Sequence, residues 1–221
     1  MSGTLSAYEG LGASGCTVGN LVFSNFTFGA NAAGAGAILP VDTGISVTPQ
    51  SSTNNAGFLF DVAIDPANNQ SLNVTVDYVV RVLSGANITD SALSVEAHGN
   101  ASADMTECLG GMLPACSGGT AVGLTADPSN LAVSNTFAGE TMVGAGFGIS
   151  ASAGGAISGE LVQFSTDPGD PGGSGDPGGS GDPDPGTGGN TTAPEPASLM
   201  LFGTGVLGLA LLLRKKIRLP L

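Results

Sequence analysis

Few side chains in this 221-residue sequence are of the types that perform acid–base or nucleophilic chemistry near neutral pH. The chain contains one histidine, His98, two residues after Glu96. A strand would place both side chains on one face, where they could hold a metal or act as a base. A solvent-facing strand has the same spacing, and no second histidine is present to complete a metal site. We therefore predict no catalytic residue, no metal site and no cofactor.

Three carboxylates, Asp61, Asp65 and Asp77, could form a cluster, but alternation on exposed strand faces also explains their spacing. A pair of glycosidase carboxylates cannot be selected by spacing alone from 18 acidic residues. The chain is predicted not to be an enzyme. A carboxylate-dependent hydrolase stays open as an alternative.

Aromatic residues give little support for a sugar-stacking surface, because the chain has no tryptophan and two tyrosines. Tyr78 shares a strand face with Val76 and Val80, which predicts a core position. A polar sugar-binding groove remains open, although the sequence does not reveal one. The DPDPG stretch at Asp182 to Gly186 alternates carboxylates but lacks the final glutamate of a calcium loop. Because neither observation excludes binding, a carbohydrate- or calcium-dependent adhesion module is kept as an alternative function.

The end of the chain has the pattern of a membrane anchor. Residues 197–213 carry no charge and would span roughly 25 Å as a helix, close to the apolar thickness of a bilayer. Four of the five basic residues follow this run: Arg214, Lys215, Lys216 and Arg218. Basic residues stay on the cytoplasmic side, so this tail is predicted to be cytoplasmic and the preceding chain external. A buried core helix is the competing interpretation of the run.

Charge is divided along the chain in agreement with that orientation. All 18 acidic residues lie at or before Glu195, where Arg81 is the only basic residue. The external part is therefore strongly acidic, which argues against nucleic acid or anionic lipid as its partner.

The order of Pro194-Glu195-Pro196, apolar helix and basic tail resembles the C-terminal sorting signal of the PEP-CTERM proteins of Gram-negative bacteria. The resemblance implies export, transient anchoring in the inner membrane, and cleavage near Pro-Glu-Pro by exosortase. It also implies a final location at the cell surface or outside the cell, with exopolysaccharide or envelope material as possible partners. The expected function is that of a non-enzymatic surface or matrix protein.

Two cysteines, Cys108 and Cys116, are predicted to form a disulfide, because both lie outside the cytoplasm and the residues between them favour a turn. Cys16 is then left without a partner. The sequence from Thr4 to Phe28 is similar to the opening of small secreted PEP-CTERM domains, and no signal peptide precedes it. We expect a natural precursor with an upstream signal peptide and a fourth cysteine. A free buried thiol at Cys16 is the alternative.

The remaining sequence predicts one all-β domain and a linker. Residues 167–193 consist almost entirely of Asp, Pro, Gly, Ser, Thr, Asn and Ala, with nothing to bury, and predict a disordered acidic linker. Residues 1–166 read as strands throughout, with period-2 alternation clearest in 72–82 and 58–65. Further strands are predicted at 21–28, 45–48, 93–97, 121–125, 131–137, 141–152 and 156–164. Short strands joined by Gly, Asn, Asp and Pro turns favour an antiparallel β-sandwich. A parallel solenoid is the alternative that the glycine content suggests.

Overall fold

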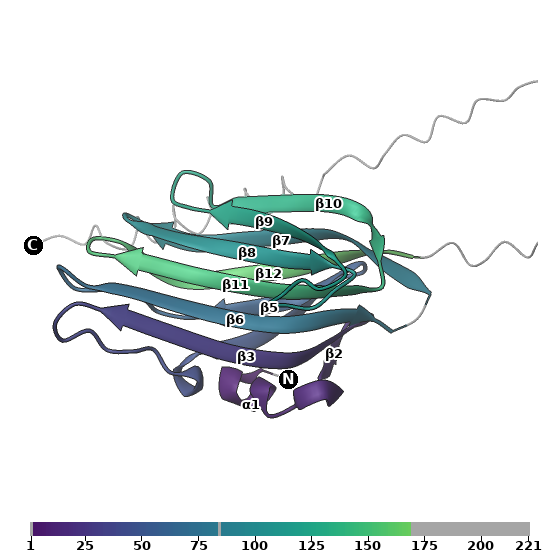
Figure 1. Cartoon of the computed structure of the whole chain (residues 1–221), viewed down its shortest axis with the longest axis horizontal. Coiled ribbons are helices and arrows are strands. Elements are labelled where there is room, and N and C mark those ends of the chain that lie inside the picture. The colour runs from purple at the N-terminus through teal and green to yellow at the C-terminus, as the bar shows by residue number, and fades with distance from the viewer. Residues whose placement is uncertain (1, 84, 169–221) are drawn as a thin grey trace, which may run out of the picture. The chain divides into compact units, whose positions relative to one another are not determined.

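Alternating apolar and polar residues form long strands, and those strands form two sheets with a shared interior. The computed structural model describes residues 2–83 and 85–168. In this part, two six-stranded antiparallel sheets pack face to face, which confirms the predicted β-sandwich and makes the solenoid alternative wrong. Sheet A has the order β1-β4-β5-β12-β7-β10, and sheet B has the order β2-β3-β6-β11-β8-β9. Figure 1 shows β3, β6, β11 and β8 side by side.

The elements follow one another along the chain with short connections. The strands are β1 (Gly3–Thr4), β2 (Cys16–Val18), β3 (Leu21–Ala33), β4 (Ser46–Ser51), β5 (Asn55–Asp61), β6 (Ser71–Val82), β7 (Ala86–His98), β8 (Ala101–Leu109), β9 (Thr120–Ala126), β10 (Ala132–Glu140), β11 (Met142–Ser152) and β12 (Ala156–Pro168). The helical elements are α1 (Leu5–Glu9) and the 3-10 turns η1 (Gly12–Ser14) and η2 (Asp42–Gly44).

The interior between the sheets is an aromatic core. The ring centroids of Phe23 and Phe58 lie 4.7 Å apart, and those of Phe60 and Phe147 lie 4.5 Å apart. Tyr78 is 2% exposed, as its strand pattern predicted. The two tyrosines and most phenylalanines of the described residues are thus inside, where they stabilise the sandwich and cannot stack on a ligand.

Two kinds of element escaped prediction. Strand β8 was missed because its inward positions include the small residues Ala101 and Ala103, which give a weak alternation signal. Helix α1 has five residues, too few to show a helical period. The strands β1 and β2 have two and three residues, too few to show a period-2 alternation. Strand β12 runs to Pro168, two residues beyond the predicted end of the domain.

Part of the prediction lies outside the described residues. The acidic linker from 169 onward, the helix 197–213, the Pro-Glu-Pro tripeptide and the basic tail all belong to that part. Among the residues that are described, none of the helices has the length and apolar character needed to cross a membrane.

Candidate functional site

The outer face of sheet B is hollowed along its middle strands. One hollow has a volume of about 660 Å³ and is lined by polar side chains of β3, β6, β8 and β11 together with the β9–β10 turn. A second hollow of about 190 Å³ follows along β6, β11 and β8. We call the two together the outer trough. Its polar lining consists of Asn31, Ser71, Asn73, Thr75, Asp77, Asn100, Ser102, Asp104, Thr106, Asp127, Ser129, Ser150 and Ser152.

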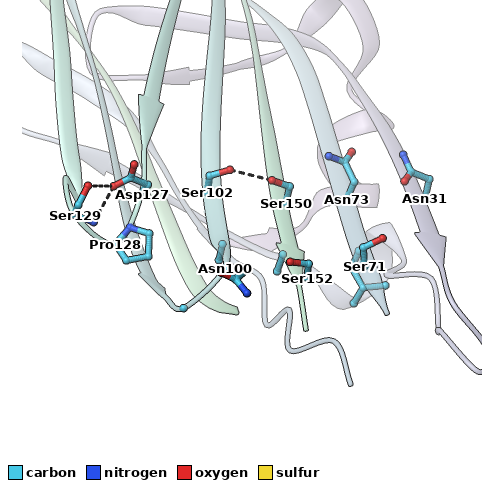
Figure 2. A pocket seen from close by; sticks show the side chains of 14 residues that line it. Asn31, Ser71, Asn73, Asn100, Ser102, Asp127, Pro128, Ser129, Ser150 and Ser152 are labelled. Carbon is cyan, nitrogen blue, oxygen red and sulfur yellow. Dashed lines mark hydrogen bonds between the residues drawn. The ribbon is translucent and has the colours of Figure 1, made fainter. Parts of the chain in front are cut away.

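A row of polar side chains crosses four paired strands and ends at the β9–β10 turn. Asn31 is opposite Asn73, Asn73 is opposite Ser150, and Ser150 is opposite Ser102. The β8–β9 ladder ends with Ala103 opposite Ala126, and the next residues, Ser102 and Asp127, both line the larger hollow. Figure 2 shows these five side chains in line across the sheet. At the ordinary strand spacing of about 4.8 Å, the row is roughly 19 Å long.

Hydrogen bonds hold the serines and the aspartate at one end of the row, whereas the two asparagines at the other end stay available. The hydroxyl oxygens of Ser102 and Ser150 are 2.9 Å apart (Figure 2). Asp127 Oδ1 accepts from the backbone N–H of Ser129 at 2.7 Å and from its hydroxyl at 2.5 Å. These hydrogen bonds lower the pKa of Asp127, so it is ionised near neutral pH. The amides of Asn31 and Asn73 make no side-chain hydrogen bond within the described residues.

The second hollow carries two further carboxylates on opposite walls. Asp104 accepts a hydrogen bond from Thr125 at 2.7 Å. Asp77 is half-buried, and burial raises its pKa. Asp77 is paired with Gly146, whereas Asp104 is paired with Gly148, so the two acids are offset along β11.

Glycines on β11 make the floor of the second hollow. The outward positions of this strand run Gly144, Gly146 and Gly148 before Ser150. A methyl group at Gly148 would have no atom closer than 3.9 Å, so this part of the floor is open. A methyl group at Gly146 would lie 2.1 Å from Asp77 Oδ1, so the absence of a side chain there lets the Asp77 carboxylate lean over the strand.

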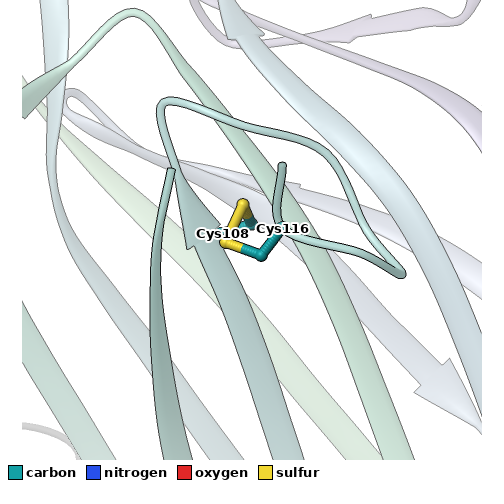
Figure 3. The surroundings of a disulfide bond; sticks show 2 residues. All are labelled: Cys108 and Cys116. Carbon is teal, nitrogen blue, oxygen red and sulfur yellow. A yellow bond between two sulfur atoms is a disulfide. The ribbon is translucent and has the colours of Figure 1, made fainter. Parts of the chain in front are cut away.

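A disulfide-bonded loop closes one end of the trough. Cys108, on β8, is bonded to Cys116, as predicted from the sequence (Figure 3). The loop between them crosses β11 closely enough that a methyl group at Gly144 would lie 2.8 Å from the Gly111 carbonyl oxygen and the Leu113 nitrogen. The disulfide therefore holds the loop on the outer face of sheet B.

Two glutamates point into the sandwich and take no part in the trough. Glu107 on β8 and Glu160 on β12 are both fully buried, and their carboxylate oxygens have no hydrogen-bond partner in the part of the chain that the structure describes. Burial raises the pKa of Glu107, and it raises that of Glu160 further, which favours the neutral acid. Ser91 and Asn135 lower the pKa of Glu107 and so offset part of the effect of burial, although neither makes a hydrogen bond to its carboxylate oxygens.

The structure does not bring the carboxylates considered from the sequence together. Asp61 is on the outer face of sheet A and Asp77 on the outer face of sheet B, so the proposed cluster with Asp65 does not form. Glu96 and His98 are both exposed on β7, and Glu96 accepts a hydrogen bond from Ser158 at 3.0 Å. Residues 2–83 and 85–168 contain no group of three His, Cys, Asp or Glu side chains able to hold a metal.

Cys16 is the one free cysteine of the chain. It is half-buried, and burial raises its pKa, which favours the thiol over the reactive thiolate. Its predicted partner in an upstream segment stays a prediction.

Sequence reasoning missed the trough residues because Asn, Ser and Thr at outward strand positions look like ordinary solvent-exposed residues. One signal was present. The run MVGAGFGIS places glycine at every second position, which leaves one face of a strand without side chains. The neighbours of that face became known only with the strand order.

Comparison with known proteins finds a described sorting motif near the end of the chain. The model of the PEP-CTERM protein-sorting motif matches residues 192–216, which include Pro194, Glu195 and Pro196. This chain carries the PEP-CTERM sorting signal. The match spans the predicted helix and Arg214 to Lys216, while Arg218 lies just beyond it. The motif implies export, processing by exosortase, and transient membrane anchoring through the C-terminal region.

A search of the curated proteins gives no match. Among solved structures, the enzymatically active domain of tailspike protein 4 of bacteriophage CBA120 matches with 14% identity and a TM-score of 0.28. The match covers 65% of this chain and 19% of the tailspike chain, so the present chain spans about a fifth of that protein's length. At this level of likeness, the tailspike carries no argument about function.

Proposed function

We propose that this chain is an exported, non-enzymatic protein of the cell surface or extracellular matrix, anchored in the inner membrane and then released by exosortase. The sorting motif at residues 192–216 is the observation that carries the proposal. The disulfide supports it, because such bonds persist in oxidising compartments outside the cytoplasm.

The positions of the acids support a role without catalysis. Glu107 and Glu160, whose raised pKa would suit a general acid, are sealed between the sheets and cannot reach a substrate. A hydrolase would need two carboxylates facing each other across an accessible cleft. Asp77 and Asp104, which line the second hollow, are the two acids that could act in this way, although they are offset along β11. Incubating the purified protein with polysaccharides and counting new reducing ends tests this part. Release of reducing ends that is lost in Asp77→Asn or Asp104→Asn would favour the hydrolase alternative.

Intact-mass analysis tests the sorting part of the proposal. In wild-type cells the mature protein should lack the chain that follows Pro-Glu-Pro, whereas in exosortase-deficient cells it should retain that chain. Glu195→Ala should retain it in both strains. Asp184→Ala, which changes an acid outside the matched motif, should be processed like the unaltered protein. A mature wild-type protein that still carries the basic tail would contradict release by cleavage.

The alternative adhesion function has a calcium-dependent form and a carbohydrate-binding form, and the structure supports them unequally. The described residues offer no group of metal-ligating side chains in support of calcium dependence. The outer trough does favour a carbohydrate ligand.

A further inference from the structure

We infer that the outer trough binds an extended segment of a neutral polysaccharide through the polar side chains of β6, β8, β11 and the β9–β10 turn. This inference rests on the proposed function, because only an exported domain meets such a polymer in bulk. It adds a site and a ligand class to that function.

The lining matches the hydrogen-bonding character of sugar hydroxyl groups. A hydroxyl both donates and accepts, and so do the amides and hydroxyls that form most of the lining. Asn31 and Asn73 make no side-chain hydrogen bond within the described residues, and their amides face the trough (Figure 2). The Ser102–Ser150 hydrogen bond uses one hydroxyl hydrogen and leaves the other for a ligand.

Charge selects a neutral polymer. The trough has three carboxylates, Asp77, Asp104 and Asp127, and no basic side chain among its lining residues. An acidic polysaccharide would therefore be repelled. The three carboxylates stand among ten neutral polar side chains in this lining, and the neutral groups suit a hydroxyl-bearing ligand better than a run of cations. Asp77 is half-buried, which leaves it the least available of the three.

The size and rigidity of the trough favour a polymer segment over a single sugar. The larger hollow alone has a volume of about 660 Å³, within the usual range of ligand sites. The polar row across it is roughly 19 Å long, more than one sugar ring can occupy. Its side chains project from paired strands, and the disulfide-bonded loop fixes one end, so little ordering is required on binding.

The floor provides a variant that fills part of the second hollow, next to the polar row, and preserves the fold. Gly148→Val adds a side chain where no atom lies within 3.9 Å of the new methyl group, in a strand that favours β-branched residues. Gly123→Val is the matched control. Gly123 is an outward glycine of β9, which is separated from β11 by β8. It has an equally open surrounding, and it does not line either hollow.

Isothermal titration calorimetry with the full chain in detergent tests the inference. The panel contains dextran, mannan, galactan and mixed-linkage glucan as neutral polymers, alginate as the acidic polymer and polylysine as the cationic one. We expect at least one neutral polymer to bind. Gly148→Val and Asn73→Ala should each weaken that binding roughly tenfold or more, and Gly123→Val should leave it unchanged.

Each other outcome overturns the inference. Absence of binding to all four neutral polymers does so, as does equal binding by Gly148→Val and Gly123→Val. Binding of alginate or polylysine alone assigns a different ligand. Thermal unfolding of each variant excludes loss of the fold as the cause. Processing of Gly148→Val in cells separates the two proposals, because correct cleavage without polysaccharide binding refutes only the trough, whereas a wild-type chain that is never cleaved refutes the proposed function.

Discussion

The outer faces of the two sheets have the same backbone pattern and different surfaces at their centres. On sheet A, Leu59 of β5 is opposite Leu161 of β12, so two large side chains cover the middle of the face. On sheet B, the corresponding middle strand presents Gly146 and Gly148. The first face is filled and the second is hollow.

Polar side chains also behave differently on the two faces. On sheet A, Ser165 donates to Asn55 at 2.6 Å and to Asp90 at 3.3 Å, and Thr136 donates to Asp90 at 3.2 Å. These groups satisfy one another across strands. Sheet B has comparable pairs in Ser102–Ser150 and Thr125–Asp104, but Asn31 and Asn73 have no such partner within the described chain. Side-chain volume at a few outward positions thus decides whether a sheet face is closed or able to receive a ligand.

The largest expected effect comes from removing the clamp on sheet B. Replacing Cys108 and Cys116 together by alanine should lower the free energy of unfolding by roughly 2.5 kcal/mol, because the short loop they close becomes free in the unfolded chain. Urea unfolding at neutral pH measures this. The effect should be largest on the hollow face, with faster amide hydrogen exchange at the outward residues of β11 than at those of β12. Uniform exchange over both sheets would contradict a clamp that is specific to sheet B.

Two glycines of the same strand should respond in opposite directions. Gly144→Ala should lower the free energy of unfolding by about 2 kcal/mol, because the new methyl group meets the Gly111 carbonyl oxygen and the Leu113 nitrogen at 2.8 Å. Gly148→Ala should raise it by roughly 0.5 kcal/mol, since alanine lacks the extra backbone entropy of glycine and fits the open floor. Chemical denaturation of both variants measures the difference. Equal values would mean that the loop does not lie on β11.

Much of this fold follows from local pattern, and little of the trough does. The alternation in β6 predicted both the strand and the buried position of Tyr78, because inward positions share one requirement, which is apolarity. The disulfide was also predictable, since its cysteines are close in sequence. The row from Asn31 to Asp127 depends on strand order and register between residues far apart in the chain, which local propensity does not encode. Glu107 and Glu160 occupy inward positions against the rule, so no pattern could place them inside.

The interior carboxyls allow a test of the contribution that each sheet makes to the core. Glu160→Met should raise the free energy of unfolding at pH 7.5 by roughly 1 kcal/mol or more, because it replaces a buried acid whose oxygens lack partners with an apolar side chain of similar length. Glu107→Met, on sheet B, should give a smaller gain, since burial raises the pKa of Glu107 less than that of Glu160.

The gain at Glu160 should depend on pH with a defined sign. The pKa of Glu160 is raised in the folded state. Below the ordinary pKa of glutamate the acid is neutral in both the folded and the unfolded chain, and the folded state is not penalised. As the pH rises toward the folded-state pKa, the unfolded chain ionises more readily and stability is lost. The advantage of Glu160→Met should therefore be small at pH 4 and larger at pH 7.5. Urea unfolding of both proteins at the two pH values measures it. An advantage that is greater at pH 4 would contradict a neutral buried acid.

The smallest expected effect concerns the filled face. Leu161→Thr places a β-branched residue on β12, which suits a strand, and removes the apolar partner of Leu59, which is itself 38% exposed. Cross-strand pairs of this kind contribute roughly 0.2 to 1 kcal/mol, so the free energy of unfolding should fall by no more than that. The polysaccharide binding inferred for the trough should not change, because the two faces are separated by the core. Denaturation and calorimetry on one protein sample report both quantities. If Leu161→Thr weakened binding as strongly as Gly148→Val, the filled face would have to belong to the binding surface, and the contrast between the two sheets would lose its functional meaning.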